Sequence, residues 1–271
     1  MGAWPANKGA GLATEILPLA KVAVAYGPPV AHITLNNPPL NVIDISMMTE
    51  LSSALAEIES QAEISILVLR GDGDCFSAGV DIAAHTPDKI NEMLGKFHAV
   101  VRALVATSKV TIAAVHGKCL GGGAELAMMC DVVITTDEAT WGFPEITLGC
   151  FPPVAAAGLS SLIGQKRASD LILTGAPMLG QEAASIGLAT RSVVKDQLDA
   201  ALDATLDHLK KSSPAVLAIA KKAIYAWDSM RFDKGLAATE KIYLDELMKT
   251  EDAQEGVQSF LAKRKPEWKG R

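Results

Sequence analysis

The chain has 271 residues, of which 49% are hydrophobic and only 5% aromatic, and its formal net charge is −6. This length is enough for one substantial core, and the composition favours a globular protein packed by Ala, Leu, Val and Ile. The negative charge argues against a general nucleic-acid-binding surface. A short basic tail, which we interpret as solvated, consists of Lys263, Arg264, Lys265, Lys269 and Arg271.

Residues 1–20 do not combine a basic start with an uninterrupted apolar run, and no other stretch reaches the roughly 18 apolar residues of a membrane span. We therefore expect neither a secreted nor a membrane-spanning chain. The cysteines show no CxxC spacing and lie among small or apolar residues, which favours free thiols over a disulfide framework or a metal site. They are Cys75, Cys119, Cys130 and Cys150. The cytoplasm is the expected compartment.

Short runs rich in Val and Ile predict six strands, at residues 22–26, 31–35, 64–70, 110–116, 132–136 and 190–194. Apolar residues at helical spacing predict helices at 47–59 and 88–107, the second with Pro87 in its first turn. After residue 181 the pattern is almost wholly helical, at 197–211, 214–227, 230–248 and 252–263. Because no low-complexity linker intervenes, we expect an α/β core with a helical C-terminal extension.

Two glutamates have distinctive surroundings. Glu125 follows three glycines in GKCLGGGAELAMMC, and Glu145 follows proline in TWGFPEITLG. Upstream, CFSAGVDI at 75–82 forms a turn of small residues whose N–H groups could face an anion. The glycines lead into a predicted helix at 124–129, whose first N–H groups are unpaired and lie at the positive end of its dipole. Taken alone, the glycines more often mark a tight turn, and the glutamates a helix cap and a solvated carboxylate.

In this order and at these separations, FSAGVD, GGGAELAMMCD and PEITLG resemble the crotonase (enoyl-CoA hydratase/isomerase) superfamily. The similarity extends from VAVAYGPPV near the start of the chain to KRKPEW near its end. It implies an α/β fold built as a spiral of β-β-α turns, with C-terminal helices at a trimer interface. We accordingly expect a spiral core at 1–194 and a helical trimerisation region at 195–271, assembled as a homotrimer or as a hexamer made of two trimers.

The resemblance also implies a catalytic arrangement. The backbone N–H groups of Val80 and Gly122 match the two donors that bind the thioester oxygen, on which enolate charge develops when a nucleophile adds to the β-carbon. Glu125 and Glu145 match the pair that moves protons, one as base towards water and the other returning a proton to carbon. Such neighbouring carboxylates should couple their titrations. Many relatives with other reactions retain one or neither glutamate, so hydration is favoured over isomerisation or thioester hydrolysis.

The family pattern also implies where CoA lies. The matching N-terminal positions are Leu40, Asn41, Val42, Ala78 and Asp81. Phe260 and Lys263 match C-terminal positions that reach CoA, often from an adjoining subunit, and their spacing places both on one helix face. Alternatively, this pair is one apolar packing residue and one solvated lysine. CoA belongs to the acyl-CoA substrate, so neither a cofactor nor a metal is expected.

Residues 148–156 read LGCFPPVAA where common hydratases have LGxxPGAGG, so Pro153 aligns with a glycine whose N–H helps to position water. Proline has no such donor. Segments 36–48, 84–98, 117–123 and 243–256 resemble the cyclohexa-1,5-diene-1-carbonyl-CoA hydratases of anaerobic aromatic degradation. We therefore expect hydration of a cyclic conjugated dienoyl-CoA. The alternatives are a short-chain 2-enoyl-CoA hydratase and a noncatalytic binding protein on the crotonase scaffold.

Overall fold

The computed structural model describes residues 20–226 and 229–271. Nearly all of the leading segment, and position 227 of one predicted helix, therefore lie outside the described residues. Six strands form the main sheet in the order β1-β2-β3-β4-β6-β9, and all neighbours are parallel except β1 and β2. The strands are β1 (Val22–Gly27), β2 (Val30–Leu35), β3 (Ile66–Gly71), β4 (Val110–Val115), β6 (Val132–Thr136) and β9 (Arg191–Val193). The six predicted strands are thus confirmed.

A second, smaller sheet has the order β5-β7-β8. Its strands are β5 (Lys118–Leu120), β7 (Thr140–Gly142) and β8 (Met178–Leu179). The sequence analysis missed all three, because a run of two or three residues is too short to show the alternation of a strand. The sheet matters for the site, since β5 leads directly into the glycines at 121–123 and β7 precedes the turn that carries Glu145.

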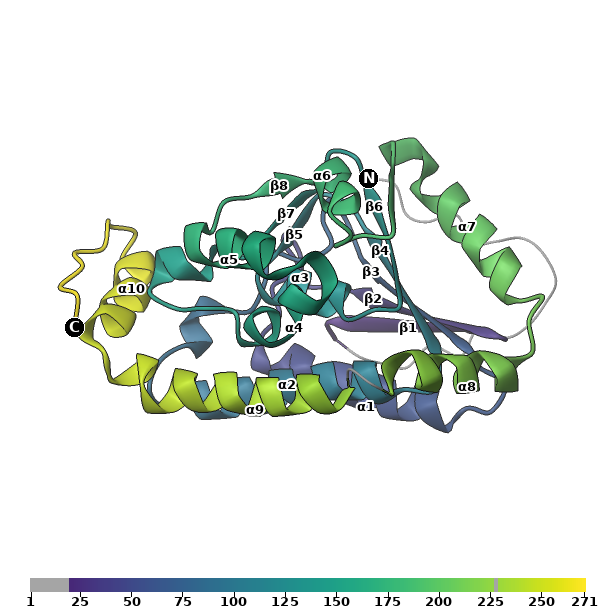
Figure 1. Ribbon diagram of the computed structural model, residues 1–271, viewed down its shortest axis with the longest axis horizontal. Coiled ribbons are helices and arrows are strands. Elements are labelled where there is room, and N and C mark those ends of the chain that lie inside the picture. Colours follow the sequence, from purple (N-terminus) through teal and green to yellow (C-terminus); the bar gives the residue numbers. More distant parts are fainter. Residues whose placement is uncertain (1–19, 227–228) are drawn as a thin grey trace.

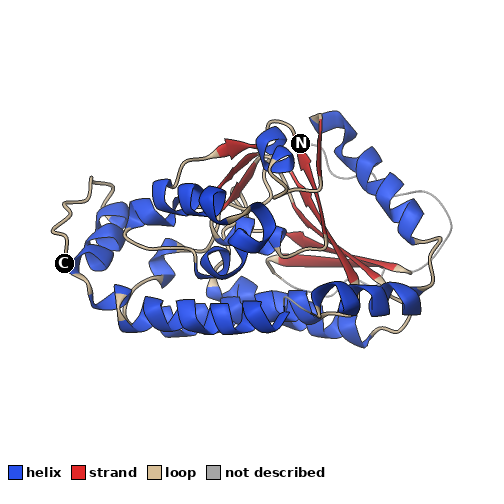
Figure 2. Ribbon diagram, in the orientation of Figure 1, coloured by secondary structure: helices blue, strands red, loops and turns tan. Residues whose placement is uncertain are grey.

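Helices surround the two sheets (Figure 2). The α-helices are α1 (Ile45–Ser60), α2 (Ile90–Ala106), α3 (Gly122–Met128), α4 (Pro153–Ile163), α5 (Gln165–Thr174), α6 (Gly180–Ser185), α7 (Leu198–Leu209), α8 (Pro214–Tyr225), α9 (Ser229–Asp245) and α10 (Glu251–Leu261). Short 3₁₀ helices are η1 (Ile82–Ala84), η2 (Pro144–Leu148), η3 (Lys195–Gln197) and η4 (Leu247–Lys249). The mixed α/β fold with a helical C-terminal region agrees with the sequence prediction.

Several predicted helix boundaries differ from the observed ones by one to three residues, and one of these differences changes the role of Pro87. Helix α2 begins at Ile90, not at residue 88, so Pro87 is not in its first turn. The Thr86 carbonyl accepts hydrogen bonds from the N–H groups of Lys89 and Ile90, at 3.0 and 2.9 Å. Residues 86–89 therefore form a separate turn, and Pro87 occupies its second position, where the fixed φ of proline is favourable.

Side chains alternate between the two faces of the main sheet and create two cores. In β3, Ile66 and Val68 face a small core that α7 covers with Leu198, Leu202 and Leu206. Leu67 and Leu69 belong to the main core on the other face of the sheet, to which α1, α2, α3 and α4 also contribute side chains. Figure 1 shows α7 separated by the sheet from these helices. Helix α3, which carries Glu125, therefore lies on the main-core side of the sheet.

Helix α9 runs alongside α2 in Figure 1 and is fixed at two points. Glu240 lies 3.2 Å from Nδ1 of His98 and 3.5 Å from the Arg102 guanidinium, both on α2. The Thr239 hydroxyl donates to the carbonyl of Pro153 at the start of α4, at 3.0 Å. The α9 helix is thus held against both α2 and α4. The proposed division at residues 194 and 195 and the trimer interface remain predictions.

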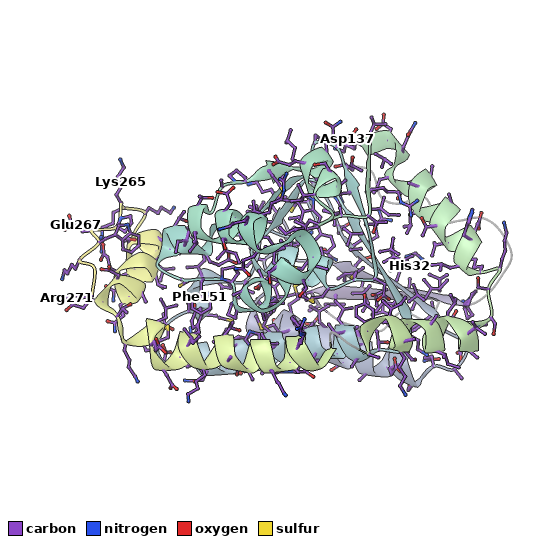
Figure 3. The ribbon with its side chains drawn as sticks, viewed as in Figure 1. His32, Asp137, Phe151, Lys265, Glu267 and Arg271 are labelled. Atoms are coloured by element: carbon purple, nitrogen blue, oxygen red, sulfur yellow. The ribbon has the colours of Figure 1, made fainter. Side chains whose placement is uncertain are left out.

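The basic C-terminal tail folds back on α10, at the end of the molecule where Figure 3 labels Lys265, Glu267 and Arg271. Both terminal nitrogens of Arg264 contact the Glu255 carboxylate, at 2.5 and 2.7 Å. Glu251 pairs with Lys269 and Arg271. The tail is exposed, as predicted, but much of its charge is balanced within the chain.

Other sequence expectations can be compared with the described residues. All four cysteines are buried and free. None of the helices in the described ranges combines the length and the apolar character needed to cross a bilayer. Within the same ranges, no three His, Cys, Asp or Glu side chains gather as a potential metal site.

Candidate active site

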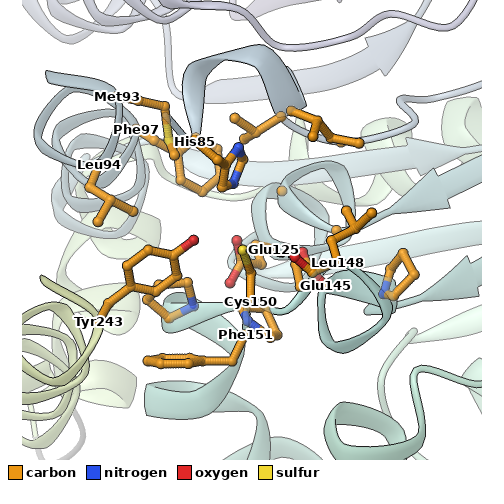
Figure 4. Close-up of a pocket in the computed structure, with 18 of the residues that line it drawn as sticks. His85, Met93, Leu94, Phe97, Glu125, Glu145, Leu148, Cys150, Phe151 and Tyr243 are labelled. Atoms are coloured by element: carbon orange, nitrogen blue, oxygen red, sulfur yellow. Dashed lines mark hydrogen bonds between the residues drawn. The ribbon is translucent and has the colours of Figure 1, made fainter. Parts of the chain in front are cut away.

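A cavity of roughly 100 Å³ lies where η1, α2, α3, η2, α4 and α9 meet. The carboxyl groups of Glu125 and Glu145 form part of its polar wall, as Figure 4 shows. Its apolar wall is formed by Met93, Leu94, Phe97, Leu148 and Phe151. The three sequence motifs, which are distant along the chain, are therefore brought to one site.

The N–H of Val80 is a backbone donor that the pairing of this segment with Ile43 does not use. Ile43 donates to the carbonyl of Gly79 at 2.9 Å and accepts from the N–H of Asp81 at 3.1 Å. Because parallel pairing uses the residues on either side of Val80, the N–H of Val80 points away from Ile43. Val80 itself lines the cavity, which leaves this N–H available at its edge.

The second backbone donor belongs to Gly122, the first residue of α3, whose N–H has no acceptor within the helix. A Cβ added to Gly122 would come within 2.5 Å of Cγ2 of Val80, so the two segments are in close contact. The preceding Gly121 has a φ of +51°, and a Cβ there would lie 2.7 Å from Oε1 of Glu145. Glycine at these positions permits the two donors and the carboxylate to approach one another.

Glu125 is only 3% exposed. Its Oε1 accepts a hydrogen bond from the N–H of Ala155, at 2.9 Å, in the first turn of α4. Pro153 begins that helix at a position that needs no N–H donor, and Pro152 precedes it. Burial raises the pKa of Glu125 above its ordinary value, although the N–H groups of Ala155 and Val154 oppose the shift.

Glu145 lies in η2, and its Oε2 is buried without a hydrogen-bond partner among the described residues. Burial, followed by the negative charge of Glu125, raises the pKa of Glu145. Two neighbouring carboxyls that both resist ionisation favour a state in which the pair keeps one proton. Such a pair can supply one acid and one base at the same time, which is what adding water across a double bond requires.

The raised pKa of Glu145 predicts a dependence of stability on pH. A carboxyl whose pKa is higher in the folded state stabilises the fold most below its unfolded pKa of about 4.3, and stability falls as pH rises towards the folded pKa. In Glu145→Gln this loss disappears. We expect the difference between the Tm of the variant and the Tm of the wild type to grow by several degrees from pH 5 to pH 8, because each kcal/mol shifts Tm by roughly 2–4 °C.

Thermal unfolding across this pH range would measure the effect. Glu138→Gln, which alters an exposed carboxyl near β7, controls for the loss of one negative charge. If the difference in Tm between wild type and Glu145→Gln stayed constant with pH, the burial of this carboxyl would not destabilise the fold.

The predicted CoA-binding positions have different environments. Asn41 is 1% exposed with a φ of +49°, and its amide nitrogen donates to the carbonyls of Asp72 and Cys75, each at 2.9 Å. Its side chain therefore holds the loop. Its backbone holds the same loop, because the Asn41 N–H donates to the carbonyl of Asn37 at 2.8 Å and the Asn41 carbonyl accepts from the Ser77 hydroxyl at 2.7 Å. Ala78 lines the cavity and donates to the carbonyl of Leu40 at 2.9 Å. Leu40 and the partly exposed Val42 lie on the same connection.

Asp81, Phe260 and Lys263 do not line the cavity. The Asp81 carboxylate caps η1 by accepting the N–H of Ala83 at 3.0 Å. Phe260 is 49% exposed, and Lys263 is exposed just beyond α10, which ends at Leu261, so the prediction that one helix face presents both residues is wrong. The same helix does reach the cavity one turn earlier, through Val257. Contacts of Phe260 and Lys263 with CoA remain a prediction, and this chain does not bring them to its own cavity.

Three residues of the cavity wall were not recognised from the sequence, namely His85, Phe97 and Tyr243. Cys150 and Phe151 line the cavity as well. Tyr243 comes from α9, far along the chain from the motifs. The sequence does contain a signal for it, because Tyr243 lies two helical turns after Leu236, and this spacing marks one apolar face of a largely polar helix. Both residues are fully buried.

Comparison with known proteins agrees with the geometry. The family model for enoyl-CoA hydratase/isomerase matches residues 27–271, which include every residue of the cavity wall. A probable enoyl-CoA hydratase of Bacillus subtilis (strain 168) is 35% identical over 256 residues, covering 92% of this chain and 98% of that protein. The cyclohexa-1,5-dienecarbonyl-CoA hydratase of Thauera aromatica is 33% identical over 240 residues, covering 89% of this chain and 93% of that protein.

Solved structures give the same result. The crystal structure of an enoyl-CoA hydratase from Mycobacterium avium subsp. paratuberculosis K-10 has a TM-score of 0.84 to this chain at 26% identity. The match covers 93% of this chain and 99% of that one. The similarity therefore includes the C-terminal helices as well as the spiral.

Proposed function

The chain belongs to the enoyl-CoA hydratase/isomerase family and is an enoyl-CoA hydratase, and from this premise we propose that its preferred substrate is a cyclic conjugated dienoyl-CoA. The proposed reaction converts cyclohexa-1,5-diene-1-carbonyl-CoA and water into 6-hydroxycyclohex-1-ene-1-carbonyl-CoA. The observation that carries the proposal is a small apolar compartment that lies beside two buried carboxyls. Phe97 and Phe151 form part of its wall. Similarity to the Thauera aromatica enzyme supports the same choice.

In the proposed mechanism, the thioester oxygen accepts hydrogen bonds from the N–H groups of Val80 and Gly122. One carboxylate, from Glu125 or Glu145, removes a proton from water as the water oxygen bonds to ring carbon C2, which is β to the thioester. The displaced π electrons form a dienolate, whose negative oxygen the two N–H groups stabilise.

Proton return completes the addition. The other glutamic acid of the pair protonates C5 at the far end of the dienolate, the electrons return to the ring as a double bond between C1 and C6, and the thioester carbonyl is restored. Renumbering the ring from that double bond gives the 6-hydroxy product. One water is consumed, and the pair of carboxyls ends with the same number of protons as at the start.

A ring substrate suits fixed catalytic groups. Its reacting carbons are held at a constant separation, whereas a flexible acyl chain must lose rotational freedom when it binds. The wall beside the carboxyls is also rigid, because Pro152 and Pro153 lie there and Phe151 packs against Tyr243 with ring centroids 5.1 Å apart. These features favour a compact and flat acyl group.

The alternative substrate is a short-chain 2-enoyl-CoA. The same groups would then add the water oxygen to the β-carbon and return the proton to the α-carbon. The Bacillus subtilis relative, a probable enoyl-CoA hydratase, favours this alternative. A noncatalytic binding role is disfavoured, because it gives no reason to bury two neighbouring carboxyls, which costs free energy.

Relative turnover tests the proposal. We expect kcat/KM for cyclohexa-1,5-diene-1-carbonyl-CoA to exceed that for crotonyl-CoA by at least about 10-fold, which corresponds to roughly 1.4 kcal/mol of transition-state stabilisation. Both substrates should be assayed with one enzyme sample at one pH, with active sites quantified independently. A clear preference for crotonyl-CoA would exclude the ring substrate and leave the hydratase function standing.

The remaining parts of the proposal concern assembly and surroundings. We propose a cytoplasmic homotrimer or dimer of trimers in which the exposed Phe260 and Lys263 of one subunit contact the CoA held by another. The exposure of Phe260 on α10 and of Lys263 just beyond it supports this, because neither residue is used in its own chain's cavity. CoA enters as part of the substrate, and the proposed chemistry uses no separate cofactor, metal or nucleic acid.

A further inference from the structure

The cavity wall contains two buried side-chain oxygens that have no oxygen or nitrogen hydrogen-bond partner among the described residues. They are Oε2 of Glu145 and the hydroxyl of Tyr243. Buried polar groups are nearly always paired in folded proteins, so an unpaired one in a cavity indicates a polar ligand. One of these groups is a carboxyl oxygen that can accept a hydrogen bond, and the other is a hydroxyl that can donate one.

Tyr243 is held rigidly in this position. It is 1% exposed, and its ring packs on Phe151 at an interplanar angle of 59°. The preceding turn of α9 is fixed by the contact of Glu240 with His98 and by the hydrogen bond from Thr239 to Pro153. Figure 4 shows the hydroxyl pointing into the cavity towards Cys150 and the glutamates.

The hydroxyl is also in the state needed to donate. Burial, followed by the neighbouring Cys150 thiol and the two glutamates, raises the pKa of Tyr243, which keeps the phenol protonated. The thiol is only a weak hydrogen-bond partner.

The first turn of α4, which also borders the cavity, offers no equivalent donor. Pro153 has no N–H, and the N–H groups of Val154 and Ala155 are directed to Glu125.

We infer that Tyr243 is a positioning residue whose hydroxyl donates a hydrogen bond to the oxygen atom that the enzyme adds to its substrate, while Glu145 accepts a hydrogen bond from the same oxygen. A water molecule held in this way keeps one lone pair free to bond to carbon. After the addition, the same phenol donates to the new hydroxyl of the product. The inference rests on the hydratase function and is independent of whether the acyl group is a ring or a chain.

Tyr243→Phe tests the inference because it removes the hydroxyl and retains the ring that packs on Phe151. Tyr225→Phe on α8, outside this cavity, is the matched control. The assays are the kcat of crotonyl-CoA hydration and the affinities for butyryl-CoA and 3-hydroxybutyryl-CoA, two ligands that differ only in the added hydroxyl. For Tyr243→Phe we expect kcat and the 3-hydroxybutyryl-CoA affinity each to fall about 10-fold, as for one lost hydrogen bond. Butyryl-CoA affinity should stay within about 2-fold, which also reports an intact fold.

Equal weakening of both ligands would overturn the inference, because it would assign Tyr243 a packing role. Unchanged kcat and unchanged 3-hydroxybutyryl-CoA affinity would overturn it as well. The wild-type protein separates these results from a failure of the proposed function. If it hydrates only the cyclic substrate, then cyclohex-1-ene-1-carbonyl-CoA and its 6-hydroxy derivative replace the ligand pair, and if it hydrates neither substrate, the hydratase assignment itself fails.

Discussion

Replacing either Glu125 or Glu145 by glutamine is expected to lower kcat by about 10³-fold, within the 10²–10⁴-fold range typical of general acid–base catalysis. Glutamine keeps the shape of the side chain but can neither remove a proton from water nor return one to carbon. In Glu125→Gln the new amide would still lie beside the first turn of α4, so folding should survive. Steady-state kinetics with a verified substrate, together with the Tm of each variant, measures the effect.

The pair should also behave as a unit. Because hydration needs one glutamate as the base and the other as the acid, losing either one disables the pair. The double variant should therefore be scarcely slower than either single variant. Glu138→Gln, at an exposed position, is the control and should retain wild-type turnover. Near-normal kcat in both single variants would show that the two-carboxyl mechanism is wrong.

Gly256→Ala is expected to destabilise the protein by about 1–3 kcal/mol, as overpacking does, and to lower kcat/KM at the same time. A Cβ at Gly256 would lie 2.0 Å from the carbonyl oxygen of Leu148 and 2.9 Å from the backbone nitrogen of Gly149. Helix α10 would have to withdraw from the end of η2, the turn that carries Glu145. The site would then lose the backing that holds its second carboxyl.

Helix propensity makes this prediction sharp, because alanine inside a helix is favoured over glycine by roughly 1 kcal/mol. A rise in the Tm of Gly256→Ala would therefore mean that α10 does not pack tightly on η2. Gln254→Ala is the control on the same helix, since Gln254 is exposed and its replacement should change stability by less than about 0.5 kcal/mol. Calorimetry and kinetics on the three proteins distinguish these outcomes.

How far the fold could be predicted depended on element length. The six strands of the main sheet have runs of Val and Ile long enough to recognise, and α1 and α7 have clear apolar faces. Helix α4 was missed because its sequence, PVAAAGLSSLI, begins with the second residue of a proline pair and has apolar or small residues on most sides. Pairing partners of β5, β7 and β8 are set by tertiary contacts, which a single sequence does not display.

In the candidate site, too, local features could be predicted from the sequence and tertiary contacts could not. Local motifs identified Glu125, Glu145, Val80 and Gly122, and the structure brings all four residues together. Their environments could not be read locally: the N–H that holds Glu125 comes from Ala155, and Asn41 is occupied by the loop at 72–76. Tyr243 depends on the path of a separate helix across the cavity. The sequence thus located the proposed reacting groups, while the fold determined their partners.

The two walls of the cavity depend differently on side-chain identity. Charge stabilisation at the thioester is assigned to main-chain N–H groups, which persist when neighbouring side chains vary. The proposed acyl compartment is built largely from side chains on α2 and just before α4, including Met93, Leu94 and Phe151. Substitutions there can reshape the space for the acyl group without replacing a reacting atom. One inherited chemistry can in this way diversify across many thioesters, and a mutational library confined to these positions would explore substrate range while leaving the reaction itself intact.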